Sequence, residues 1–143
     1  MIALSAVRGN LFTFIPDTTK GGPEITVAVD LLTEWVRANH IPITAIACEQ
    51  EQAEKFYRDN GVEPHRLARI TAKHLRSPVL LLDLGDGTHM LADGNHRYVV
   101  AAANGITRLP AWLVKHSYWQ PFRVDMPLAL GEETLRTMFS GIR

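Results

Sequence analysis

Apolar and polar positions in the second half of the chain predict a strand hairpin, a short helix and a further strand. The expected elements are a strand at 79–84, a glycine-rich turn at 85–87, a strand at 88–92, a helix at 99–104 and a strand at 109–114. Gly105 directly follows the helix and is a typical helix stop. Because the strand at 79–84 is almost wholly apolar, we expect it in the centre of the sheet.

The first half of the chain predicts short strands and amphipathic helices. The expected elements are a hairpin or two edge strands at 1–7 and 11–15, a loop at 17–23, a helix from Asp30 to just before Pro42, a buried strand at 43–48 and a helix at 49–60. Asp30 is a favourable helix cap, and Gly61 is expected to end the second helix. A closing helix is predicted at 132–140.

Composition limits the classes of partner. The chain has 143 residues, 46% of them hydrophobic, which suits one domain with a substantial core. It carries 15 Lys and Arg against 15 Asp and Glu, so its overall field does not attract a polyanion. A nucleic acid would therefore have to be bound through a local basic patch.

The single cysteine and the absence of long apolar runs predict the compartment. Cys48 has no partner for a disulfide within the chain, which fits a reducing environment. The sequence has neither the pattern of a signal peptide nor about 18 consecutive apolar residues, the length of a transmembrane helix. We therefore expect a cytoplasmic protein that has no membrane partner.

The run L-A-D-G-N-H-R-Y at 91–98 carries the most distinctive chemistry, because it joins a predicted strand to a predicted helix. The first N–H groups of a helix lack intrahelical acceptors and lie at the positive end of the helix dipole, so they favour phosphate or carboxylate. His96 and Arg97 would add charge and directed donors. The end of a sheet is also where open sheets usually hold ligands. The sequence therefore predicts an anion site here.

Each residue of this run also has a structural interpretation. Asn95 is a good helix cap, and Asp93 is a good turn residue as well as a candidate general base or cation ligand. Gly94 suits either a positive φ or the close approach of a ligand. Arg97 suits a bidentate phosphate contact or an ion pair with Asp93 or Asp83. The remaining members, His96 and Tyr98, would otherwise be a structural histidine and a core aromatic residue.

A basic segment at 63–76 is a second candidate. Pro64 suits the first position of a helix, and the spacing predicts one helix with a basic stripe formed by Arg66, Arg69, Lys73 and Arg76. The stripe would either contact phosphate or be the solvated face of an amphipathic helix.

The remaining histidines and aromatic residues favour structural roles. His65, His74, His89 and His116 lack the spacing of a zinc site. The aromatic residues Trp112, Tyr118, Trp119 and Phe122 fit a core or a partner surface better than a platform for stacked bases.

The run D-G-N-H-R-Y, the alanine-rich helix after it and the run G-I-T-R-L-P-A-W-L-V resemble the signature segment of the ParB/sulfiredoxin-like superfamily. The resemblance covers 78–114 and, less closely, 63–76, and it does not reach the first sixty residues. It implies an α+β fold, a mixed α/β arrangement with a small mixed sheet and flanking helices. It also implies one domain at 1–143, with a core at 63–125 and an N-terminal elaboration at 1–62.

The resemblance also implies site roles, because members of this superfamily hold nucleotide phosphates at the helix start. The implied phosphate ligands are Gly94, Asn95, His96 and Arg97, with Arg66, Arg69 and Lys73 closing the pocket. Asp93 and His96 are the implied catalytic residues, and Asp93 is also the implied ligand of Mg²⁺. Asn95 occupies the position of the sulfiredoxin cysteine nucleophile, so reduction of sulfinic acid is not expected.

The expected function is a nucleotide-binding enzyme that hydrolyses or transfers a phosphoryl group, with ATP, ADP or CTP as the nucleotide. Free serine kinases are among the relatives that the resemblance brings in. One alternative is a ParB-like metal-dependent nuclease, in which Asp93 and His96 help to hold the metal. The other alternative is a non-catalytic, nucleotide-gated module that binds DNA or protein.

Overall fold

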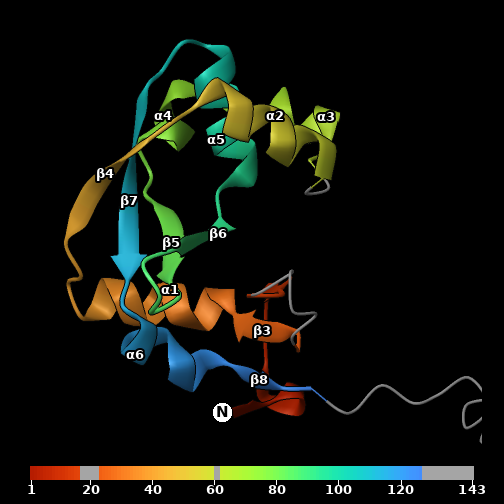
Figure 1. The fold of residues 1–143 in the computed structure, drawn as a ribbon, viewed down its shortest axis with the longest axis vertical. Helices are drawn as coiled ribbons and strands as arrows, with labels where there is room; N and C mark the ends of the chain where they lie inside the picture. Colours follow the sequence, from red (N-terminus) through yellow and green to blue (C-terminus); the bar gives the residue numbers. More distant parts are fainter. Residues whose placement is uncertain (17–22, 60–61, 127–143) are drawn as a thin grey trace, which may run out of the picture.

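The computed structural model describes residues 1–16, 23–59 and 62–126, and these form a mixed α+β fold, as the sequence predicts (Figure 1). The strands are β1 (Ile2–Ala3), β2 (Leu11–Phe14), β3 (Ile25–Ala28), β4 (Ile43–Ala47), β5 (Val79–Asp83), β6 (His89–Asp93), β7 (Arg108–Val114) and β8 (Val124–Asp125). The helices are α1 (Val29–Ala38), α2 (Gln50–Asp59), α3 (Pro64–Leu67), α4 (Ala72–Leu75), α5 (Asn95–Ala103) and α6 (His116–Trp119). Two 3-10 turns lie at Leu4–Ala6 and Gln120–Phe122.

The main sheet is built around β5. Its strand order is β4-β7-β5-β6, so β5 lies between β7, which runs parallel to it, and β6, which runs antiparallel. The predicted hairpin and the central position of its first strand are both confirmed. Strand β5 reads V-L-L-L-D, a run that needs apolar neighbours on both faces of a sheet.

The two faces of the main sheet cover two hydrophobic cores. Leu80 and Leu82 pack with buried residues of β3, α1 and β7, whereas Val79 packs with buried residues of α5 and α2. Successive side chains of a strand point to opposite faces, so β5 contributes to both cores. Figure 1 shows α2 to α5 gathered at one end of the molecule, with α1, α6, β3 and β8 at the other. The elements of the predicted anion site therefore belong to the α5 side.

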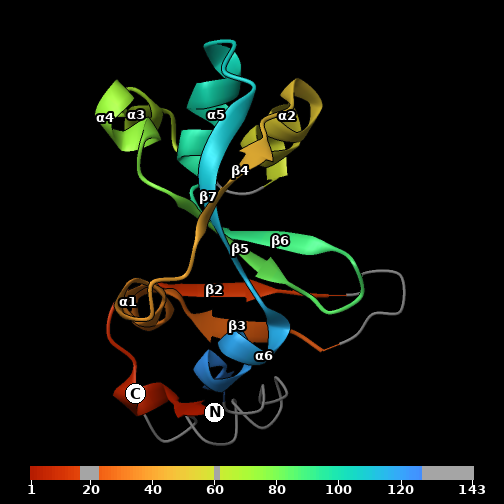
Figure 2. The same ribbon diagram turned by 90° about the vertical axis from the view of Figure 1, so that its left-hand side faces the viewer.

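Of the two alternatives for the first two strands, the hairpin is wrong, and two separate edge strands are observed. Strand β1 pairs in parallel with β8. Strand β2 pairs antiparallel with β3, which lies beside it in Figure 2. The partner of β1 is distant in sequence, so local pattern does not reveal it, whereas β3 is the next strand along the chain after β2 and was not predicted. Asp30 is not the cap of α1, because the cap position is Ala28; its carboxylate instead accepts a hydrogen bond from the Asn10 backbone N–H at 2.9 Å.

The strand expected to be buried at 43–48 is an exposed edge strand. Among the described strands β4 pairs only with β7, and Ile46 is its one half-buried residue. Ile43 is 59% exposed, whereas Cys48, just past the strand, is buried. The helix predicted next is confirmed as α2. The predicted loop at 17–23, apart from Pro23, lies outside the described residues, and so do the predicted stop at Gly61 and the predicted helix at 132–140.

The single helix predicted over the basic segment is two short helices. Helix α3 ends at Leu67, and α4 begins only after Thr71, whose backbone is extended at φ −111° and ψ 170°. The Thr71 N–H donates to Nδ1 of His74 at 3.0 Å, which stabilises a new helix start. Because of this break, the basic residues of the segment do not form the straight stripe predicted for a single helix.

Two of the aromatic residues at 112–122, Trp112 and Trp119, belong to the core. Trp119 is 1% exposed, and its indole N–H donates to the carbonyl of Asp83 at 2.7 Å. Trp112 is also buried, and Tyr118 lies against Trp35 with ring centroids 5.3 Å apart. The core interpretation is confirmed for both tryptophans. None of the helices in the described ranges is long and apolar enough to cross a membrane.

Candidate functional site

Gly94 makes the turn from β6 into α5. Its φ is +113°, in the left-handed region that L side chains rarely adopt. A Cβ built there would lie 2.4 Å from Cγ1 of Val79, so any side chain would collide with the central strand. Gly94 is also the cap position of α5 and Asn95 is the first helical residue, so the prediction of Asn95 as the cap is wrong.

The turn leaves the start of α5 with free donors. The carbonyl of Gly94 accepts the Tyr98 N–H at 2.9 Å, which is the first hydrogen bond of the helix. The N–H groups of Asn95, His96 and Arg97 have no acceptor within the described part of the chain. Three unpaired N–H groups at the positive end of a nine-residue helix favour an anion.

A cleft of about 230 Å³ lies against this helix start. We name it the α5 cleft; its lining residues are Arg66, Arg69, Ile70, His74, Asp93, Gly94, His96 and Arg97. Three of them are arginines and one is an aspartate, so the cleft is cationic although the whole chain has a net charge of zero. The structure thus brings Arg66 and Arg69 to the predicted site, whereas Lys73 does not line it.

The main role of Arg97 is to connect α5 to the segment before β5. Its guanidinium donates to the carbonyls of Ser77 and Pro78 at 2.9 and 3.1 Å, and it forms an ion pair with Asp93 at 3.3 Å. Its side chain is only 16% exposed. The structural interpretation, an ion pair with Asp93, is confirmed, while Asp83 instead accepts the Gly85 N–H. Arg97 therefore fixes α5 to the segment before β5 and adds positive charge at the wall of the cleft.

His96 ties α5 to the start of α3. Its Nε2 accepts the backbone N–H of Glu63 at 3.1 Å, so this nitrogen carries no proton. Burial lowers the pKa of His96 below its ordinary value of 6.5, and the positive charge of Arg66 lowers it further. His96 is therefore neutral near pH 7 and acts as a positioning residue, rather than as the added charge that the sequence suggests.

Asp93 is the acidic group of the α5 cleft. Its side chain is 55% exposed, and among the described residues it is the only carboxylate that lines the cleft. The described ranges bring no three His, Cys, Asp or Glu side chains together in the manner of a metal site. One carboxylate is enough for Mg²⁺ only where phosphate oxygens supply further ligands.

Asn95 is half-buried, and the carbonyl oxygen of its side chain, Oδ1, is buried without a hydrogen-bond partner among the described residues. A buried acceptor left unpaired costs about 1–3 kcal/mol, so such groups call for an explanation. Asn95 lines a hollow of about 210 Å³ that shares Arg66, Asp93, Gly94 and His96 with the α5 cleft.

Tyr98 and His74, two further residues of the site region, hold neighbouring backbone in place. Tyr98 is buried, as its core interpretation predicts; its hydroxyl accepts the Glu49 N–H at 2.8 Å and donates to the Ala47 carbonyl at 3.2 Å. His74 lines the α5 cleft, a position that we did not expect from the sequence. The pattern Thr71-x-x-His74, in which the side chain of the fourth residue caps the helix, could have revealed it.

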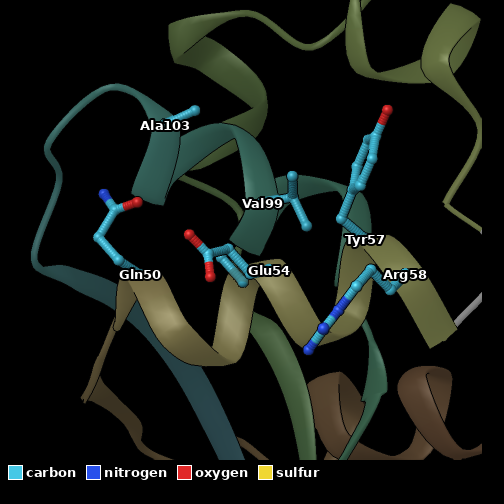
Figure 3. A pocket seen from close by; sticks show the side chains of 7 residues that line it. Gln50, Glu54, Tyr57, Arg58, Val99 and Ala103 are labelled. Atoms are coloured by element: carbon cyan, nitrogen blue, oxygen red, sulfur yellow. The ribbon is translucent and has the colours of Figure 1, made fainter.

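A different hollow separates α2 from α5. It has a volume of about 310 Å³, and its lining residues are Gln50, Ala53, Glu54, Tyr57, Arg58, Val99 and Ala103. Figure 3 shows side chains of α2 lying opposite Val99 and Ala103 of α5. This hollow contains one arginine and one glutamate and none of the predicted site residues, so it lacks the cationic character of the α5 cleft.

Comparison with protein-family models, curated proteins and solved structures finds no match to this chain.

Replacing Gly94 by alanine should destabilise the fold by about 2–5 kcal/mol, because the left-handed backbone costs about 1–2 kcal/mol and the contact with Val79 adds an overpacking cost. Gly87 provides a matched control, since its φ is +89° but nothing lies within 4 Å of its added Cβ. Gly87→Ala should cost only the backbone part. Urea denaturation of both variants measures the difference; equal losses would contradict the role of Val79.

The lowered pKa of His96 predicts a small loss of stability as the pH falls. The neutral ring accepts the Glu63 N–H, so this contribution is present above pH 6.5 and is lost as the pH falls through the lower pKa of the folded state. The expected loss is below about 1 kcal/mol, because the site is screened by solvent. In His96→Gln, which keeps an acceptor but does not titrate, the pH slope should be shallower than in wild type. The exposed His89→Gln variant is the control, and identical slopes in all three proteins would rule out this role.

Proposed function

We propose that the α5 cleft binds the phosphate groups of a nucleotide and that the chain hydrolyses or transfers a phosphoryl group. The observation that supports this best is the helix start itself, where three free N–H groups meet a cleft lined by three arginines. Backbone donors of this kind bind phosphate without loss of conformational freedom, since the turn at Gly94 has already fixed them.

The balance of charge favours phosphate over a carboxylate. Arg66 and Arg69 are exposed at the cleft, and no described residue gives either of them an ion pair. Arg97 is held in place by its carbonyl contacts and by Asp93. A ligand with several negative charges would interact with more of these groups at once than a single carboxylate can. A polyphosphate is therefore the better candidate.

Asp93 is the residue best placed for chemistry. It lines the cleft beside the free N–H groups, and Arg97 holds one of its oxygens. An oriented carboxylate can accept a proton from a water molecule or from an acceptor hydroxyl. Mg²⁺ would have Asp93 as its protein ligand and would lower the repulsion between phosphate oxygens.

Binding without turnover is a second candidate function. It is favoured by the ion pair between Asp93 and Arg97, and by the absence of a second carboxylate among the described residues of the cleft. The two candidates share the binding step and differ only in turnover.

The test is a thermal-shift screen of ATP, ADP, CTP and GTP, each with and without Mg²⁺, followed by phosphorus NMR on any nucleotide that binds. A ligand at one hundred times its dissociation constant should stabilise the fold by about 2.7 kcal/mol. Binding with turnover supports the first candidate, and binding without turnover supports the second. Cleavage of DNA in the absence of nucleotide would instead indicate a nuclease, and no binding at all would refute both candidates.

Arg66→Gln and Arg69→Gln should each weaken nucleotide binding by about three- to tenfold and flatten its dependence on salt, because each removes a solvent-screened contact to phosphate. Lys73→Gln is the matched control, since Lys73 lies in the same basic segment but does not line the cleft. Glutamine keeps good helix propensity, so stability should hardly change. Calorimetric titration at two salt concentrations measures the effect. If the two arginine variants behave like the control, the cleft is closed by other groups.

A further inference from the structure

We propose that a further hollow, beside Asn95, binds a small primary amine in its ammonium form. We name it the amine hollow. The hollow has a volume of about 350 Å³, and its lining residues are Phe12, Thr13, Phe14, Asp59, Met90 and Asn95. Asn95 also lines the hollow that adjoins the α5 cleft, so this one side chain belongs to the lining of both hollows. Apart from Asn95, the amine hollow uses a different set of residues from the proposed phosphate site, and the two proposals can fail separately.

The charge of the amine hollow is opposite to that of the α5 cleft. Asp59 is the only charged residue that lines it within the described ranges. Asp59 is also the last residue of α2, a ten-residue helix, and the C-terminal end of a helix carries the negative end of its dipole. Both features favour a cation and disfavour a phosphate.

The polar groups of the amine hollow are predominantly hydrogen-bond acceptors. The Asn95 Oδ1 is buried and unpaired within the described structure, the Asp59 carboxylate only accepts, and the Thr13 hydroxyl is already paired with Thr26 at 2.9 Å. A primary ammonium group has three N–H donors. They can bond to the Asp59 carboxylate, to a lone pair that the Thr13 hydroxyl keeps beside its bond to Thr26, and to Oδ1 of Asn95 once that amide has turned. Rotation of the Asn95 amide about χ2 would present Oδ1 to such a donor and satisfy it.

The apolar wall fits the body of an alkylamine. Phe12 and Phe14 stack with ring centroids 5.4 Å apart, and Met90 lines the hollow beside them. Aromatic faces attract a nearby cation through the ring quadrupole, and the thioether of Met90 adapts its shape to an apolar group. A nucleobase is less suitable, since it presents acceptors as well as donors to a hollow that is rich in acceptors.

The proposal can be tested by proton–nitrogen NMR titration of the full chain with isobutylamine, isobutanol and tetramethylammonium. Isobutanol has the same body without the charge, and tetramethylammonium has the charge without donors. We expect saturable shifts with isobutylamine at the amides of residues 12–14 and 90 and at the side-chain amide of Asn95, with an affinity at least about fivefold higher than for either analogue. Equal responses to all three compounds would overturn the proposal, and so would saturation of these signals by ADP instead of the amine.

Two variants with a matched control make the test specific. Asn95→Ala should weaken isobutylamine binding by about tenfold, and Asp59→Asn by about two- to fivefold, because the carboxylate is exposed. Glu51→Gln removes an exposed charge from the same helix, away from the hollow, and should leave binding unchanged. If Asp59→Asn and Glu51→Gln have the same effect, the amine is attracted only by general surface charge and the proposal is wrong. Should a variant fail to fold, the comparison of the three compounds on the wild-type chain still decides.

Discussion

The close approach of Gly94 to Val79 determines where the groups of the proposed anion site lie. Val79 is fully buried in the central strand, and the backbone at position 94 passes so near that a Cβ would be 2.4 Å from its methyl group. Only glycine permits both this contact and the left-handed turn. The turn directs α5 away from the end of the sheet and leaves its first N–H groups free. The free N–H groups at which we propose that an anion binds are therefore a consequence of how the sheet is packed.

The remaining groups of the site come from segments that the fold brings to this turn. Arg97 fastens α5 to the carbonyls of Ser77 and Pro78, and His96 accepts the N–H of Glu63 at the start of α3. Arg66 and Arg69 thereby reach the cleft from a segment about thirty residues away in sequence. A local excess of positive charge arises in a chain whose net charge is zero, which matches a compact anion better than a long polyanion.

The sequence predicted the elements whose pattern is local. The hairpin of β5 and β6, the helix α5 and the strand β7 follow from apolar runs, a glycine-rich turn and a glycine stop. Prediction from the sequence failed where the position of a strand depends on residues far away in the chain. Examples are the pairing of β1 with β8 and the exposure of β4 at the edge of the sheet. The sequence predicted Gly94, Arg66 and Arg69 as members of one site, and the structure places all three at the α5 cleft. It did not foresee the carbonyl contacts of Arg97, because these depend on a loop that only the fold places beside α5.

The central claim is that the first N–H groups of α5 bind phosphate. The most direct measurement is a proton–nitrogen NMR titration of the full chain with inorganic pyrophosphate, followed at the backbone amides of Asn95, His96 and Arg97. A hydrogen bond to an anion deshields the amide proton, so the account predicts large, saturable downfield shifts at these three residues, with smaller changes near Arg66 and Arg69. Saturable binding that leaves the three amides unmoved, or no binding at low salt, would contradict it.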